Sequence, residues 1–168
     1  MPTITQTPDG HVFESAEGET ILRAALRAGI GMPYSCNIGS CGNCRFQLLD
    51  GEVTHLRADA PAWSERELKR GRWLGCQAVP NGACSVKFRT MDKYIPHNQP
   101  EAFEAELVDA TVITRDISEF IFKSSAAPAF RPGQYALLHV PGVEGGRAYS
   151  MSNLGDDGNW KFMIKHMP

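Results

Sequence analysis

The sequence lacks the features that direct a chain into a membrane, along a secretory route or onto a nucleic acid. Its 168 residues contain no apolar run long enough to span a bilayer. Met1–Gln6 show no basic segment followed by an apolar one. There are 17 Lys and Arg against 19 Asp and Glu, a net charge of −2, and no basic run stands out. We therefore expect no membrane span, no secretory signal and no nucleic-acid partner.

The sequence also has no dinucleotide fingerprint of the form G-x-G-x-x-G. That absence excludes a nicotinamide-binding domain of this type from the residues given. Histidine is sparse, with five in the chain, and none of them lies among the clustered cysteines.

Cysteine, by contrast, is concentrated in one short segment. Cys36-x4-Cys41-x2-Cys44 is followed far downstream by Cys76, which is the ligand spacing of a plant-type 2Fe–2S cluster. The residues between the first three are small or polar, so the backbone can fold tightly around an inorganic core and aim N–H groups at sulfur. The pattern predicts that the four thiolates hold one cluster. Thiolates awaiting a cluster must stay reduced, which favours a cytoplasmic location.

Other interpretations of the cysteines fit less well. A structural zinc usually takes two C-x2-C-like pairs, and Cys76 has no Cys or His partner at that spacing. Cys41 and Cys44 alone could form a thioredoxin-like redox pair, but this leaves Cys36 unexplained and lacks the flanking β-α-β pattern. A Rieske centre needs two histidine ligands. Cys84 begins an apolar strand pattern and is expected to be a buried small residue rather than a ligand.

The first ninety residues predict a small mixed sheet crossed by a helix. Turn residues predict two hairpins, and Thr20 and Gly29 bound an amphipathic helix. A capping box, with Trp63 and Leu68 as a hydrophobic staple, predicts a short helix before Cys76. The expected elements are strands Thr3–Gln6 and His11–Ser15, a helix with apolar positions from Ile21 to Leu26, a strand through Phe46 and Leu48 paired with Glu52–Thr54 across Asp50-Gly51, the capping box Ser64–Glu67, and a strand Ser85–Arg89.

This segment resembles a plant-type ferredoxin, which implies a β-grasp fold for residues 1–91. Photosynthetic ferredoxins are similar in cysteine spacing but strongly acidic. Residues 1–90 here carry ten Lys and Arg and nine Asp and Glu, so we do not expect long-range steering to be the main docking force. A partner tethered in the same chain would need none.

The rest of the chain reads as a linker followed by β-structure. Residues 92–100 are polar, contain two prolines and interrupt the strand pattern. Several short strands then suggest an all-β barrel or sandwich. The expected strands are Phe103–Leu107, Thr111–Thr114, Ile117–Lys123, Tyr135–Val140 and Trp160–Lys165.

Two motifs in this second part extend the resemblance. Arg147-Ala148-Tyr149-Ser150 offers a guanidinium for a pyrophosphate, a phenol ring to cover a flavin and a hydroxyl for a ring nitrogen, although an ordinary barrel strand with a surface arginine also fits. The Pro132–Tyr135 turn opens into a strand. Together, and after a ferredoxin module, they make the chain similar to reductase components of bacterial multicomponent oxygenases.

That resemblance implies an α+β chain: residues 1–91 a β-grasp 2Fe–2S domain, 92–100 a linker, and 101–168 an incomplete antiparallel β-barrel of the flavin-binding reductase type. It further implies FAD at Arg147, Tyr149 and Ser150, NADH as electron donor, and an oxygenase or ferredoxin component as acceptor. The family's next elements, a helix closing the flavin phosphate site and a nicotinamide domain, are absent from the residues given. We expect the front part of a longer reductase that is inactive with NADH by itself. The alternative is a stand-alone 2Fe–2S electron carrier with a non-functional C-terminal extension.

Overall fold

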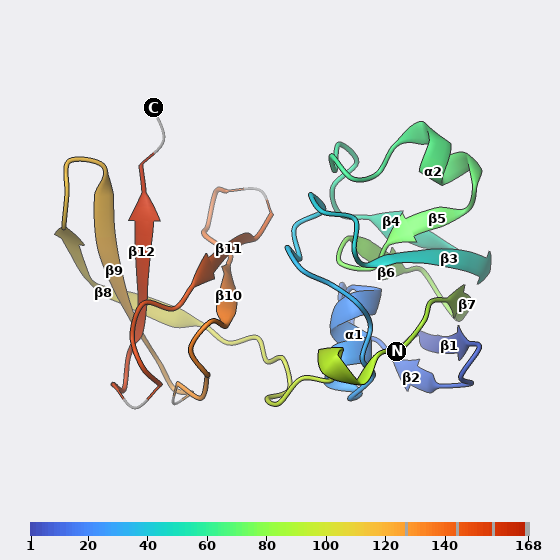
Figure 1. Cartoon of the computed structure of the whole chain (residues 1–168), viewed down its shortest axis with the longest axis horizontal. Helices are drawn as coiled ribbons and strands as arrows, with labels where there is room; N and C mark the ends of the chain where they lie inside the picture. The colour runs from blue at the N-terminus through green and yellow to red at the C-terminus, as the bar shows by residue number, and fades with distance from the viewer. Residues whose placement is uncertain (127, 144, 156, 167–168) are drawn as a thin grey trace. The chain divides into compact units, whose positions relative to one another are not determined.

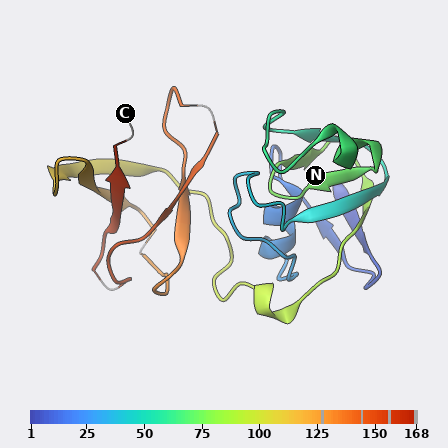
Figure 2. The same cartoon turned by 45° about the horizontal axis from the view of Figure 1, so that its top comes forward.

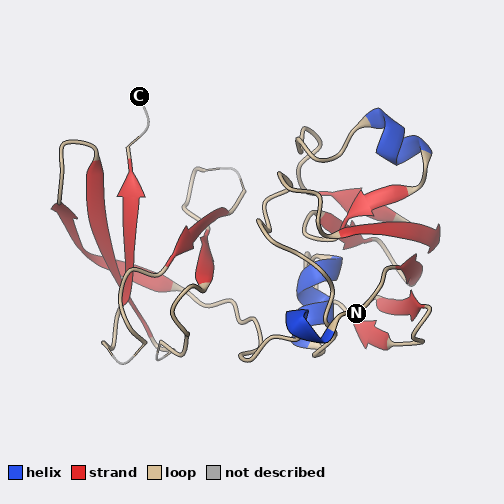
Figure 3. Ribbon diagram, in the orientation of Figure 1, coloured by secondary structure: helices blue, strands red, loops and turns tan. Residues whose placement is uncertain are grey.

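The computed structural model describes the whole chain except residues 127, 144, 156, 167 and 168. The chain divides into two compact units, Met1–Pro100 and Glu101–Pro168, whose helices and strands are coloured by type in Figure 3. Among the described residues, no helix combines the length and apolar character needed to cross a bilayer.

The first unit is built on a mixed five-stranded sheet in the order β2-β1-β7-β3-β5. Strands β1 and β7 pair in parallel, and the other pairs are antiparallel. Helix α1 packs on one face of this sheet (Figures 1 and 2), which gives the β-grasp arrangement expected from the sequence. The sheet strands are β1 (Thr3–Thr7), β2 (Val12–Glu14), β3 (Arg45–Asp50), β5 (Arg72–Leu74) and β7 (Cys84–Lys87).

The hairpin predicted across Asp50-Gly51 is wrong. Both edges of β3 are already occupied, by β5 and by β7. The next strand, β4 (Val53–His55), therefore pairs with β6 (Ala78–Pro80) in a separate two-stranded sheet. The strands that occupy the edges of β3, namely β5 and β7, come from later in the chain than β4. The residues of the Asp50-Gly51 turn carry no information about them.

Helix α1 (Ile21–Arg27) is specified by its cap and by its apolar face. The Thr20 hydroxyl accepts a hydrogen bond from the Arg23 N–H at 3.5 Å, as predicted. The helix ends at Ala28, and Gly29 follows with a φ of +74°. Five of its seven residues are buried in the core of the unit: Ile21, Leu22, Ala24, Ala25 and Leu26.

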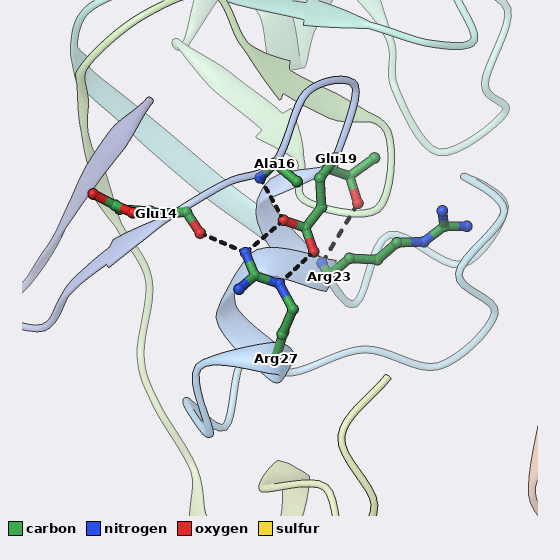
Figure 4. A network of polar contacts seen from close by, with 6 residues as sticks. Glu14, Ala16, Glu19, Arg23 and Arg27 are labelled. Carbon is green, nitrogen blue, oxygen red and sulfur yellow. Dashed lines mark hydrogen bonds and ion pairs between the residues drawn. The ribbon is translucent and has the colours of Figure 1, made fainter. Parts of the chain in front are cut away.

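Arg27, the last residue of α1, is bound to Glu19 and to Glu14 of strand β2 (Figure 4). The Arg27 guanidinium donates to both carboxylate oxygens of Glu19, at 3.0 and 2.8 Å, and to the Glu14 carbonyl at 2.8 Å. The Ala16 N–H also donates to Glu19, at 2.8 Å. Burial opposes ionisation of the carboxyl, but these donors together lower the pKa of Glu19.

Helix α2 (Glu65–Lys69) forms, but without the predicted capping box. Within the described residues, the Ser64 side chain makes no cap hydrogen bond. The Glu67 carboxylate forms ion pairs with Arg45 and Arg72, at 3.4 and 3.6 Å. The carboxylate that would complete the box is thus used by two arginines of the neighbouring sheet strands. Leu68, the expected staple residue, is 45% exposed.

The start of the predicted linker is held on the first unit. The short 3-10 helix η1 (Asp92–Tyr94) places the Tyr94 ring 6.0 Å from the Tyr34 ring. The Met91 N–H donates to the Gly31 carbonyl at 2.9 Å. These contacts fix residues 91–95 against the segment that leads into the cysteine loop.

The second unit is antiparallel. Strands β12, β9 and β8 form one sheet and β10 with β11 another, and a bridge joins Met151 to Phe162. Two of the expected strands merge into one long strand, β8, which has a register shift between Leu107 and Asp109. The strands are β8 (Ala105–Val112), β9 (Ile117–Ser124), β10 (Tyr135–Leu138), β11 (Arg147–Ser150) and β12 (Trp160–Lys165).

Candidate metal centre

The four predicted ligands lie in two segments. Cys36, Cys41 and Cys44 belong to the loop between α1 and β3, and Cys76 belongs to the turn between β5 and β6. The two segments are joined through the backbone, because the Gly75 N–H donates to the Cys44 carbonyl at 2.8 Å. All five cysteines of the chain are free thiols.

Backbone N–H groups surround the sulfurs of the loop. The Ser40 and Cys41 N–H groups each donate to Cys36 Sγ at 3.3 Å, and the Asn43 N–H donates to Cys41 Sγ at 3.5 Å. Burial alone would raise the pKa of Cys36, but the N–H groups directed at its sulfur hold that pKa below the usual value. The loop is therefore shaped to stabilise thiolate, the form in which cysteine binds iron.

Cys44 and Cys76 form the buried side of the site, with 3% and 4% of their surfaces exposed. The Cys76 N–H donates to Cys44 Sγ at 3.5 Å, and the Gln77 side-chain amide donates to Cys76 Sγ at 3.6 Å. The hydrogen bond between the two thiols raises the pKa of Cys44 and lowers the pKa of Cys76 to about 7. Two neighbouring buried sulfurs share one proton in this way, because two negative charges there would repel each other.

The loop needs glycine at Gly39. Its φ is +82°, in the left-handed region, and a Cβ there would lie 2.9 Å from the Ala60 Cβ and 3.3 Å from Gln77 Cγ. Asn37 also has a positive φ, 56°. The loop is therefore tightly turned and leaves its backbone N–H groups accessible, as the small and polar residues between the cysteines predict.

Three aromatic rings pack together beside the turn that carries Cys76. The His55 ring lies 3.9 Å from the Trp63 ring and 5.2 Å from the Trp73 ring. The two tryptophan rings lie 5.1 Å apart. His55 Nε2 accepts the Leu74 N–H at 3.2 Å. The sequence indicated a supporting role for Trp63 and for the segment from Trp73 to Cys76, but it did not indicate one for His55.

Cys84 lies apart from this arrangement, at the start of β7. It is 4% exposed and belongs to the hydrophobic core of the unit. Burial raises the pKa of its thiol, which is the environment of an unreactive core cysteine, as predicted.

The donor set fits a binuclear cluster. A 2Fe–2S core takes four thiolates, two on each iron, and the loop with the Cys76 turn supplies four cysteine sulfurs. Four free thiols with N–H donors at their sulfurs fit that group.

The predicted flavin residues lie on β11. Register pairs Ser150 with Tyr135 and Arg147 with Leu138 on β10. Arg147 and Tyr149 are two positions apart and share one face of the pair, while alternation directs Ser150 to the other face. The Arg147 guanidinium donates to the carbonyls of Gly145 and Gly146, at 3.5 and 3.4 Å. The guanidinium and the phenol ring could therefore meet one ligand from the same side.

The fold and the cysteine loop define an iron–sulfur domain, and residues 4–81 match the family model described as 2Fe-2S iron-sulfur cluster binding domain. The chain is 40% identical over 156 residues to ferredoxin–NAD(P)(+) reductase CarAd of Metapseudomonas resinovorans, covering 90% of this chain and 47% of that protein. It is 36% identical over 147 residues to the ferredoxin–NAD(+) reductase component of the Xanthobacter autotrophicus alkene monooxygenase system, covering 87% and 44%.

A solved structure agrees over nearly the entire chain. The ferredoxin reductase in carbazole 1,9a-dioxygenase, in its FAD apo form, superposes with a TM-score of 0.92 at 35% identity, covering 99% of this chain and 52% of that one. The chain spans about half the length of these relatives. Over its whole length the chain is similar to the N-terminal part of these oxygenase reductase components, and its residues 4–81 match the 2Fe–2S domain.

Proposed function

We propose that this chain is the front part of an NADH-dependent reductase that passes electrons through FAD and a 2Fe–2S cluster to an oxygenase or ferredoxin component. The observation that carries the proposal is the cysteine loop, where backbone N–H groups point at Cys36 and Cys41 sulfurs and Cys44 and Cys76 close the buried side. Likeness to reductases over most of the chain supports the same function.

The four cysteines would hold the cluster, which when bound supplies one-electron transfer at roughly −400 mV. Their N–H donors stabilise negative charge on sulfur, and the burial of Cys44 and Cys76 keeps water from that side. Cys41 is exposed and Cys36 partly exposed, whereas Cys44 and Cys76 are buried, so the exchange of electrons would take place on the loop side. Five free thiols suit the reducing cytoplasm, where we place the protein.

FAD enters the proposal through Arg147, Tyr149 and Ser150. Arg147 would bind a pyrophosphate through its planar fork, Tyr149 would cover the flavin ring from the same face, and Ser150 would reach a ring nitrogen. These three residues supply one wall of a site. Residues 101–168 are then a partial flavin domain, and the NADH-binding part lies in the remainder that longer relatives have.

The test of the cluster is reconstitution of the chain under anaerobic conditions with iron and sulfide. We expect two irons and two sulfides per chain and a red-brown protein. Cys76→Ser should lose or strongly shift the visible spectrum, while Cys84→Ser, a matched change of a buried cysteine in the same unit, should keep it. Bound zinc in place of iron, or equal loss in both variants, would overturn the assignment.

A further inference from the structure

Cations that are distant in the sequence meet on the outer face of the five-stranded sheet. Gln47 on β3 pairs with Arg72 on β5 and with Lys87 on β7. Because residues directly opposite in antiparallel strands share a face, these three form one rung across the sheet. All three are exposed, whereas Phe46 and Val86, their neighbours along the strands, are buried in the core.

This rung lines a hollow of about 640 Å³. Four of its ten lining residues are cationic and one is acidic: Arg45, Arg72, Lys87 and Arg89 against Asp9. The Asp9 carboxylate already accepts hydrogen bonds from the Thr90 hydroxyl at 2.8 Å and from the Gln6 amide at 3.1 Å. Glu67, which is not among the lining residues, forms ion pairs with Arg45 and Arg72. Four cations against Asp9 and Glu67 still leave this face positive, although the charges over residues 1–90 nearly balance.

The hollow borders the cysteine loop through Arg45. A Cβ on Gly42, which lies between Cys41 and Cys44, would be only 2.7 Å from the carbon of the Arg45 guanidinium. That guanidinium is held in place, because it donates to the Ala62 carbonyl at 3.0 Å and pairs with Glu67 at 3.4 Å. A molecule seated on the hollow would thus lie beside the loop that carries three of the four proposed ligands.

The spread of the cations selects the kind of partner. The backbones at Arg72 and Lys87 are two strand spacings apart, about 10 Å, and Arg45 and Arg89 add two further cations to the same hollow. Several separate acidic groups on one surface would satisfy them. We propose that this face docks a redox protein with an acidic surface, and that the docked complex exchanges electrons through the cysteine loop. This inference rests on the proposed electron-transfer function.

The experiment uses the reconstituted chain, reduced with dithionite and mixed in a stopped-flow instrument with two acceptors. Cytochrome b5 is the acidic protein probe and 1,4-benzoquinone the small neutral one. The rate to cytochrome b5 should fall steeply as salt is added, and Lys87→Glu/Arg89→Glu should lower it about tenfold at low salt. The rate to benzoquinone should not change. Arg57→Glu/Lys69→Glu makes the same change in net charge outside the hollow and should keep most of the cytochrome rate.

The outcomes separate this inference from the proposed function. A chain that assembles no cluster refutes the proposed function. In a second outcome, the chain reduces benzoquinone normally, but its rate with cytochrome b5 changes neither with salt nor in Lys87→Glu/Arg89→Glu. This result would be consistent with the proposed function and would overturn the docking surface. If both double variants lose the same fraction of the cytochrome b5 rate, the effect comes from net charge alone, and the docking surface is also overturned. Tight binding of a 20-nucleotide DNA probe that Lys87→Glu/Arg89→Glu abolishes, with an unchanged cytochrome rate, would reassign the face to nucleic acid.

Discussion

His55 Nε2 accepts the backbone N–H of Leu74 at 3.2 Å, two residues before Cys76. The imidazole is thereby the neutral tautomer with its proton on Nδ1, which is buried and has no hydrogen-bond partner in the described part of the chain. The ring is fixed from its other sides by Trp63 and Trp73. His55 of β4 thus anchors the backbone at Leu74, where the segment leading to the fourth proposed ligand, Cys76, begins.

Replacing His55 should loosen that turn. His55→Phe keeps a ring between the tryptophans but leaves the Leu74 N–H without an acceptor, which should lower the free energy of unfolding by about 1–3 kcal/mol. His55→Gln places an amide oxygen near the position of Nε2 and should recover part of the loss. Thermal melts and the half-life of the visible spectrum under a chelator measure the two effects. Greater stability of His55→Phe than of His55→Gln would show that ring packing, not the hydrogen bond, positions the turn.

His55 also makes stability depend on pH. Burial disfavours the imidazolium and lowers the pKa of His55 from 6.5 to about 4. Below pH 6.5, His55 is protonated in the unfolded chain, whereas in the folded chain it stays neutral until the pH approaches 4. The stabilisation is therefore complete above pH 6.5 and declines as the pH falls toward 4. The melting temperature of the wild type should drop over this range more than that of His55→Gln, and parallel pH profiles would contradict the linkage.

Glu67, rather than Ser64, should matter at helix α2. Ser64→Ala removes a hydroxyl that makes no cap hydrogen bond, so it should change stability by less than about 0.5 kcal/mol. Glu67→Gln removes the charge shared by Arg45 and Arg72 and should cost about 0.5–1 kcal/mol, because both arginines are nearly half exposed. Urea titrations of the two variants check the order, and adding salt should narrow the difference. A larger loss of stability in Ser64→Ala than in Glu67→Gln would show that Ser64 caps the helix after all.

Gly39 should tolerate no side chain. Gly39→Ala would force a left-handed backbone on alanine and press its Cβ against Ala60, lowering stability by about 1–2 kcal/mol and reducing cluster yield. Gly82→Ala is the control, because nothing lies within 4 Å of its Cβ position and its φ is not positive. Iron content after reconstitution compares them. Normal cluster yield in Gly39→Ala would mean that the loop adjusts more freely than its packing indicates.

Arg147 should be needed for flavin retention in a chain extended through the nicotinamide domain. The present chain should bind FAD weakly or not at all, because the proposed residues Arg147, Tyr149 and Ser150 would form only one wall of the site. In the extended chain, Arg147→Ala would remove the proposed bidentate phosphate contact and should weaken FAD binding about tenfold or more. Arg115→Ala, an exposed arginine in the turn between β8 and β9, should leave it unchanged. Stoichiometric FAD on the short chain, or unaltered retention in Arg147→Ala, would remove residues 101–168 from the flavin assignment.

The sequence predicts best those features that depend on local chemistry. The spacing of Cys36, Cys41 and Cys44 has a direct meaning, and the cap at Thr20 needs only its own helix. The predicted hairpin of β3 with β4 failed because one edge of β3 is taken by β7, a strand that begins more than thirty residues after β3 ends, and the other edge by β5. Ser64–Glu67 has the pattern of a capping box, yet Glu67 is drawn away by arginines of two strands.

Features that arise from strand register were not visible in the sequence. Arg72 and Lys87 are fifteen positions apart, and only the common neighbour Gln47 brings them onto one rung. His55 likewise looked like one of several scattered histidines until the sheet placed it against the segment before Cys76. Local patterns therefore identified the proposed ligands, while the residues that surround and support them required the tertiary structure.

The anchored start of the linker sets the length of the tether between the two units. The Met91 N–H and the Tyr94 ring are held on the first unit, and the Phe103 ring packs 5.2 Å from Trp160 in the second. Only residues 96–102 are left to connect them, with a reach of at most about 25 Å. Over such a distance the effective concentration of one unit around the other is in the millimolar range. A separate ferredoxin would have to reach a comparable concentration to compete with the tethered iron–sulfur unit for the electrons of the flavin that we propose for residues 101–168.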